Sequence, residues 1–172
     1  MPSSDKTNPL DFVKKVDDLK ATGVEFWLDP KSWRSCRLSC ALTWREVQFG
    51  IASRSSVPSE RGVYVFVVRP TGSSFPPHGY LMYVGITGDT SDARTLRVRF
   101  GNYLADQRRV KRPAIHYMLN KWKRHVYFCF ATVSDRRISL AKIERSLNDG
   151  FLPPCSKNDF SAEVRQRRAA FI

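Results

Sequence analysis

Two apolar runs decide the fold: GVYVFVV at residues 62–68 and YLMYVGI at residues 80–86. Both are rich in β-branched and aromatic residues, which favours strands. The segment between them, residues 69–79, contains prolines and glycines and is therefore predicted to be a loop. Because side chains alternate between the two faces of a strand, a hairpin of these runs can bring Tyr64 and Tyr83 to one face of a sheet.

The chain after this hairpin combines helices with one further strand. Ser139 is the expected N-cap of the last of these helices, and Gly150 is its expected end. The predicted elements are a helix over residues 93–107, a helix over 114–122, a strand over 125–133 and a helix over 140–148. This order predicts an α+β fold, sandwich-like, in which a small three-stranded, mostly antiparallel sheet is flanked by helices.

The chain divides into an N-terminal extension (1–60), a main domain (61–160) and a basic C-terminal tail (161–172). An amphipathic helix is expected at the start of the extension, because apolar residues recur there at helical spacing, and Gly23 supplies its stop. The rest of the extension holds three of the four tryptophans among basic residues. For these tryptophans, packing in a core is favoured over stacking on bases. They are Trp27, Trp33 and Trp44.

The charge of the chain indicates a polyanionic partner. Lysine and arginine number 29 against 16 aspartates and glutamates, which leaves a formal net charge of +13. Basic groups that neutralise phosphates release counterions, so nucleic acid is the expected partner; a solvated surface kept for solubility is the alternative for any single cluster. The residues expected to contact nucleic acid are Arg97, Arg108, Arg109, Lys111, Arg112 and Lys121.

Several classes of protein are disfavoured. The longest apolar run, residues 63–68, is far short of the ~20 residues that a membrane-spanning helix needs, and the N-terminus lacks the apolar segment of a signal peptide. The four cysteines show no paired CxxC arrangement of the kind that structural zinc sites use. A cytoplasmic protein with reduced cysteines and no membrane contact is expected, with a nucleoid-associated or nuclear location as alternatives.

Taken together, these motifs resemble the GIY-YIG nuclease family. Residues 62–64 (GVY) and 83–85 (YVG) match its two defining tripeptides, with valine in place of isoleucine in both. The segment LRVRFGNY, 96–103, is similar to the next family motif, an arginine followed four residues later by tyrosine or histidine. KIERSLND, 142–149, supplies the family glutamate, and Asn158 matches a family asparagine. Each motif alone is weak, whereas their conjunction in the right order is specific.

The resemblance covers roughly residues 60–160 and leaves one assignment open. The loop after Gly85 is longer than in many family members, so Arg97 competes with Arg99 for the role of the catalytic arginine. Tyr103 favours Arg99, because only that choice places an aromatic partner at i+4 on the same side of a helix.

Two family features lack a clear counterpart. Some members carry a lysine just after the second tripeptide, where this chain has Ile86 and Thr87. A histidine that some members place before their second helix is also missing, because His116 falls inside the predicted helix and is assigned a structural role.

The resemblance implies metal-assisted hydrolysis of phosphodiester bonds in DNA. Glu144 would hold Mg²⁺ (or Mn²⁺), since a hard cation accepts one carboxylate together with waters and a phosphate oxygen. Tyr64 would help to deprotonate the attacking water, with Arg99 and the metal favouring its phenolate form. Arg99 would also stabilise charge on the phosphate in the transition state.

The resemblance also implies roles for the remaining site residues. Tyr83 and Tyr103 would position water or phosphate by hydrogen bonds. Gly62, Gly85 and Asn158 would support the site. The enzyme would act as a monomer or a homodimer, and its biological role in restriction, repair, mobility of a genetic element or defence stays open.

Other functions remain as alternatives. The chain could be a catalytically inactive nucleic-acid-binding module on the same fold, or a nuclease directed at RNA. For Tyr64 and Tyr83 alone, the simpler interpretation is a pair of cross-strand core aromatics.

Overall fold

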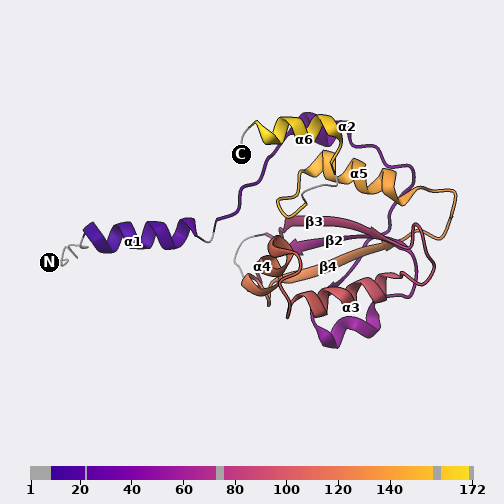
Figure 1. The fold of residues 1–172 in the computed structure, drawn as a ribbon, viewed down its shortest axis with the longest axis horizontal. Coiled ribbons are helices and arrows are strands. Elements are labelled where there is room, and N and C mark those ends of the chain that lie inside the picture. The colour runs from indigo at the N-terminus through magenta and orange to yellow at the C-terminus, as the bar shows by residue number, and fades with distance from the viewer. Residues whose placement is uncertain (1–8, 22, 73–75, 157–159, 171–172) are drawn as a thin grey trace.

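The fold is built on one four-stranded antiparallel sheet. The computed structural model describes residues 9–21, 23–72, 76–156 and 160–170 (Figure 1). The strand order is β1-β4-β2-β3. The strands are β1 (Arg45–Gln48), β2 (Gly62–Val68), β3 (Tyr80–Thr87) and β4 (Val126–Thr132).

The predicted hairpin is present as β2 and β3. Tyr64 lies opposite Gly85, and Phe66 lies opposite Tyr83, so the two tyrosines share a face as expected. The register shifts just after Phe66. Because of this irregularity, Met82 packs in the same cluster as its neighbour Tyr83, although strict alternation would place the two on opposite faces.

The prediction of three strands is also wrong, because β1 adds a fourth. Arg45 and Gln48 of β1 lie opposite Phe130 and Tyr127 of β4, in an antiparallel pair. This strand falls within the first 60 residues, so the predicted N-terminal extension contributes one edge of the sheet. The α+β class itself agrees with the structure.

The helices mostly follow the predicted positions. Thr95 caps α3, and Ser139 caps α5 as expected, each by accepting a hydrogen bond from a backbone N–H. Gly150 does not end α5, because the helix continues to Phe151 and is closed by Leu152 in the left-handed conformation (φ 49°). The helices are α1 (Pro9–Lys20), α2 (Pro30–Ser35), α3 (Leu96–Asp106), α4 (Pro113–Lys121), α5 (Leu140–Phe151) and α6 (Ala162–Ala169), with a 3₁₀ turn at η1 (Ile51–Ser56).

Two apolar clusters lie on opposite faces of the sheet. The first contains Tyr64 and Phe66 with the inner residues of α3 and α4. The second contains Val63 and Val65 with the inner residues of α5. Figure 1 shows the resulting layers, with α5 above the sheet beside α2 and α6, and with α3 below it. The alternation along β2 therefore assigns its tyrosine to the α3 side.

The N-terminal residues and the basic tail form helices at the periphery. The expected first helix is present as α1, which projects away from the sheet layers (Figure 1). Trp33 and Trp44 are about two-fifths exposed, at 40% and 41%, so the core packing favoured for them is not found. Residues of the basic tail form α6, beside α2. No helix in the described part of the chain is long and apolar enough to cross a membrane.

Candidate active site

Residues from two of the sequence motifs meet in one hydrogen-bonded chain. Arg99 Nε donates to the hydroxyl oxygen of Tyr64 at 2.9 Å. The hydroxyl oxygens of Tyr64 and Tyr103 lie 2.9 Å apart and share a further hydrogen bond. Arg99 and Tyr103 both project from α3, one turn apart, so the helix presents them together to β2. The i, i+4 pairing expected from the sequence is the pairing that the structure contains.

Both motif glycines lie where a side chain would collide with a neighbour, and for Gly85 that neighbour is Tyr64. Gly85 lies directly across from Tyr64, and a Cβ atom on Gly85 would overlap the phenol ring and hydroxyl of that tyrosine. A Cβ atom on Gly62 would overlap the carbonyl oxygen of Ala131 on β4. The glycine of the second tripeptide thus makes room for the tyrosine of the first.

The structure separates the two arginines that competed for this site. Arg97 points away from the tyrosines, since its guanidinium donates to the carbonyl oxygens of Val57 at 2.7 Å and Ser55 at 3.1 Å. Arg99 is the one that contacts Tyr64. Arg97 therefore fastens α3 to the segment that follows β1.

Tyr83 completes the aromatic group from the edge strand β3. Its ring centre lies 6.3 Å from the ring centre of Tyr64 and 6.3 Å from that of Tyr103. It is slightly exposed at 9%, whereas Tyr64 and Tyr103 are fully buried. These three tyrosines form the tyrosine cluster, and Tyr83 is its most exposed member.

Burial dominates the electrostatics of Tyr64. It raises the pKa of Tyr64 well above its ordinary value, Tyr103 and Tyr83 raise that pKa further, and Arg99 lowers it. The expected effect of Arg99 on the phenolate thus has the right sign but is outweighed, and Tyr64 is a neutral phenol in this conformation. For Arg99, burial alone would lower the pKa, but the hydroxyls of Tyr64 and Tyr103 raise it overall, so the guanidinium stays charged.

A second arginine, Arg112, contacts Tyr103 of this group. Its Nη1 donates to the hydroxyl oxygen of Tyr103 at 3.1 Å, and its Nη2 donates to Asp106 Oδ2 at 2.5 Å. The sequence placed Arg112 among the residues that contact nucleic acid, and no family motif pointed to it. His116, assigned a structural role, places its Nδ1 3.1 Å from the carbonyl oxygen of Asp106 at the end of α3.

Glu144 lies on a different element and on the other side of the sheet. It is half-buried on α5, whose inner residues pack on the face opposite the tyrosine cluster. Its one-turn neighbour Asn148 is buried and donates to the carbonyl oxygen of Glu144 at 3.0 Å. Asn158, the expected supporting residue, falls outside the described residues.

The donor chemistry of Glu144 fits a weakly anchored magnesium ion. Among the residues that the structure describes, no group of three or more histidines, cysteines, aspartates and glutamates gathers as a ready-made cage. Mg²⁺ does not require such a cage, because it keeps several waters and is often bound through one or two carboxylates and substrate phosphates. A single half-buried carboxylate is consistent with that mode of binding.

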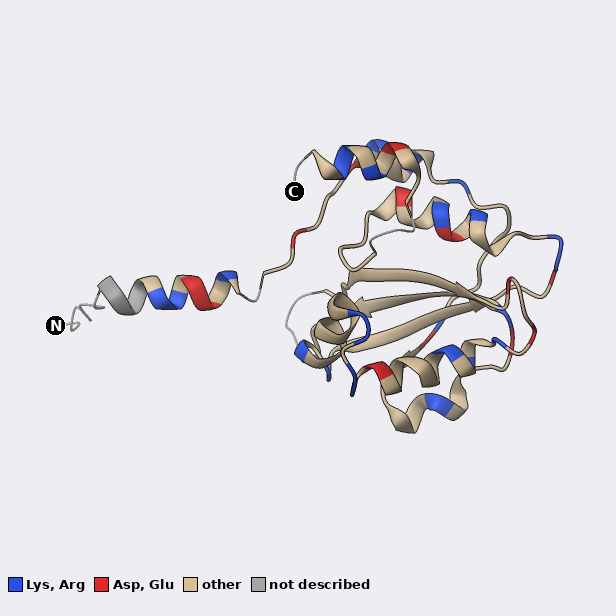
Figure 2. Ribbon diagram, viewed as in Figure 1, with Lys and Arg blue, Asp and Glu red and all other residues tan. Residues whose placement is uncertain are grey.

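Most of the basic residues expected to contact nucleic acid are exposed, and they follow Tyr103 in the sequence. Three of them lie in the connection from α3 to α4, where Figure 2 shows basic ribbon segments between the two helices, and the fourth is the last residue of α4. Arg97 and Arg112 are the exceptions, since both are half-buried: Arg97 donates to backbone carbonyls and Arg112 turns inward. The exposed members are Arg108, Arg109, Lys111 and Lys121.

Comparisons with known proteins add no assignment. No family model matches the chain, and neither a curated protein nor a solved structure matches it.

Proposed function

We propose that the chain is a metal-dependent endonuclease that hydrolyses phosphodiester bonds in DNA. The observation that carries the proposal is the chain from Arg99 through Tyr64 to Tyr103, in which residues from separate motifs contact one another at hydrogen-bond distance. Core aromatics need no charged partner, so a half-buried arginine held against two buried phenols is better explained by a ligand that carries negative charge. The excess of basic residues supports a polyanionic substrate.

The residues have distinct roles in this proposal. Arg99 stabilises negative charge on the phosphate, because a guanidinium offers several fixed donors. Tyr83, at the partly exposed edge, and Tyr103 orient water or phosphate through their hydroxyls. Glu144, on the α5 side of the sheet, would hold Mg²⁺, which when bound would supply Lewis-acid polarisation of a phosphate oxygen.

Tyr64 accepts the proton of the attacking water only after it has lost its own. Because burial raises its pKa, the reactive fraction is small at neutral pH and increases as the pH rises. Cleavage is therefore expected to accelerate with pH up to the point at which the protein unfolds. Substrate must also open a path to this hydroxyl, since Tyr64 is fully buried in the present conformation.

The test is nicking of supercoiled plasmid in the presence of Mg²⁺, Mn²⁺ or EDTA, with arms on single-stranded DNA and RNA. Arg99→Ala should abolish cleavage, whereas the matched variant Arg97→Ala, two residues away on the same helix, should retain it, because Arg97 donates to backbone carbonyls and contacts none of the tyrosines. Glu144→Ala should abolish cleavage while DNA binding persists in a gel-shift assay. Metal-independent cleavage, or undiminished nicking by Glu144→Ala, would contradict the proposal.

A second candidate is an inactive nucleic-acid-binding module. It is favoured by the complete burial of Tyr64 and Tyr103, which pack with Phe66 and Phe128 as an ordinary aromatic core. In that case wild-type protein would bind DNA but leave plasmid intact with every metal, and Arg99→Ala would lower stability without changing any activity.

A further inference from the structure

Arg112 lies in a basic loop, yet its side chain contacts the tyrosine cluster through Tyr103. Its guanidinium carbon lies 4.4 Å from the ring centre of Tyr103, and its Nη1 also donates to the hydroxyl of that ring. The guanidinium carbon of Arg99 lies 5.5 Å from the same ring centre. Tyr103 is therefore held by two cations, one from α3 and one from the connection that follows it.

Two neighbouring residues hold Arg112 in its position. It precedes Pro113, the first residue of α4, and has the extended backbone that a following proline imposes (φ −126°, ψ 96°). Its Nη2 donates to the carboxylate of Asp106, the last residue of α3, and the Asp106 side chain is only 13% exposed. Asp106 and Tyr103 lie one turn apart on α3, so Arg112 bridges both and clamps the end of that helix.

The two arginines limit how the hydroxyls of Tyr64 and Tyr103 can form hydrogen bonds. Guanidinium groups only donate, so Tyr64 accepts from Arg99 and Tyr103 accepts from Arg112. The two hydroxyls use one of their hydrogens between themselves. The other hydroxyl hydrogen is left to donate outside the pair, so the group can offer a hydroxyl donor beside the two guanidinium groups. That arrangement suits an anionic oxygen.

We propose that Arg112 is a positioning residue of this site, which holds the Tyr103 hydroxyl in place as the partner of Tyr64. This inference rests on the proposed nuclease function, and it reassigns Arg112 from contact with nucleic acid to control of the reacting hydroxyls. Arg109, three residues earlier in the same loop, is exposed and serves as the matched control of equal charge.

The first experiment compares kcat and KM for plasmid nicking in three variants. Arg112→Ala should lower kcat about ten-fold with KM changed less than about two-fold, because a charge-assisted bond to a reacting group is lost. Arg112→Lys should recover part of that kcat, because lysine keeps the charge. The recovery should be incomplete, because lysine cannot bridge Tyr103 and Asp106. Arg109→Ala should raise KM and leave kcat unchanged. An Arg112→Ala variant that behaves like Arg109→Ala would overturn the inference.

The second experiment does not depend on activity. Arg112 covers the ring of Tyr103, which is fully buried, while the Arg112 side chain itself is 35% exposed. Arg112→Ala should therefore make Tyr103 reactive to nitration, located by mass spectrometry, whereas Arg109→Ala should leave it protected. Unchanged protection in Arg112→Ala would overturn the inference. Wild-type protein that nicks with neither metal would overturn the nuclease function, while nitration would still decide the role of Arg112.

Discussion

Tyr64 can lie across β3 only because Gly85, its partner on that strand, has no side chain. Gly85→Ala would place a methyl group inside the space of the Tyr64 ring, which is fully buried. We expect a loss of roughly 1–3 kcal/mol in the free energy of unfolding, typical of an overpacked core. Urea denaturation measures this loss, and the displaced hydroxyl should also remove cleavage.

Gly50→Ala is the control for this substitution. A Cβ atom on Gly50 would meet nothing within 4 Å, and its backbone is extended (φ 174°). The expected change in unfolding free energy is about 0.5 kcal/mol or less. Equal losses in the two variants would show that backbone freedom, rather than the Tyr64 ring, explains the glycine.

The raised pKa of Tyr64 predicts how stability depends on pH. In the unfolded chain a tyrosine titrates near pH 10, whereas folded Tyr64 keeps its proton to higher pH. Its contribution is therefore complete below about pH 10 and is lost above it, because only the unfolded state releases the proton. Urea denaturation between about pH 8 and 11 should show a steeper fall for wild type than for Tyr64→Phe.

The same comparison removes the effect of the buried thiols. Burial raises the pKa of Cys155 to about 11 and that of Cys129 to about 12, so both also favour unfolding at alkaline pH. They do so equally in wild type and in Tyr64→Phe. Parallel stability curves for the two proteins would contradict the assigned shift of Tyr64.

For single residues, the sequence predicted the contacts that follow from spacing along one strand or one helix. Period-two alternation placed Tyr64 and Tyr83 on one face, and i, i+4 spacing selected Arg99 over Arg97. Arg112 was out of reach, because its contact with Tyr103 depends on how a loop folds back over the end of α3. The burial that raises the pKa of Tyr64 was out of reach for a related reason: it comes from the packing of separate elements.

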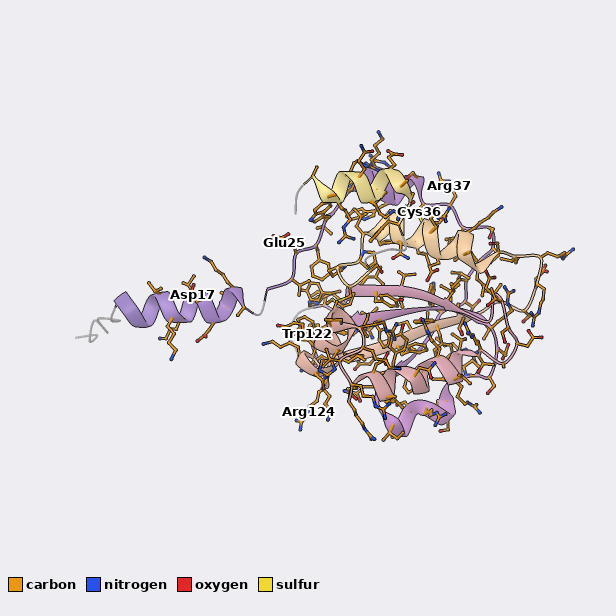
Figure 3. The ribbon with its side chains drawn as sticks, viewed as in Figure 1. Asp17, Glu25, Cys36, Arg37, Trp122 and Arg124 are labelled. Atoms are coloured by element: carbon orange, nitrogen blue, oxygen red, sulfur yellow. The ribbon has the colours of Figure 1, made fainter. Side chains whose placement is uncertain are left out.

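Among the elements, α3 and α5 each contain an internal glycine, and the two should respond oppositely to alanine. In α3 a Cβ atom on Gly101 would lie 3.3 Å from the guanidinium of Arg54, which is exposed and can shift. In α5 a Cβ atom on Gly150 would lie 2.9 Å from Cys36 Cβ, close to the backbone where α2 ends; Figure 3 labels Cys36 at this junction.

Gly101→Ala should therefore stabilise the protein by up to about 1 kcal/mol, the usual gain in helix propensity. Gly150→Ala gains the same propensity but must push α2 away from α5, so a net loss of about 1 kcal/mol is expected. Thermal and urea unfolding of both variants measure the signs. A stabilising Gly150→Ala would show that α2 does not pack on α5 as described.

Element prediction worked where hydrophobic patterning was strong and failed where it was weak. The runs of β2 and β4 are apolar enough to be assigned from sequence, as is the capped amphipathic α5. By contrast β1 (REVQ) is a short edge strand with one partly buried residue, Val47, and its identity comes only from pairing with β4. Gly150 was misassigned as a helix end because a glycine needed for close packing has the same sequence signature as one needed for a turn.

Over the whole molecule, the candidate site residues lie on both faces of the sheet. The α3 side holds the buried tyrosine cluster with its two inward arginines, and the exposed basic residues flank the connection from α3 to α4. The α5 side contributes Glu144. A nucleic acid that contacts both sides has to pass an edge of the sheet, and β3, the strand that carries Tyr83, is one of the two edge strands.

The net charge of +13 predicts strongly salt-dependent binding, and its distribution predicts which charges matter. Replacing Arg108, Arg109 and Lys111 by alanine should make the slope of log K against log[salt] shallower by about 2 to 3 for duplex DNA, because three phosphate contacts no longer release counterions. Fluorescence anisotropy of a labelled duplex measures this slope. The control replaces three exposed lysines of α1, Lys14, Lys15 and Lys20, which lie on the projecting helix and should change the slope by less than about 1. Equal changes in the two triple variants would mean that DNA responds to total charge and not to the surface beside the tyrosine cluster.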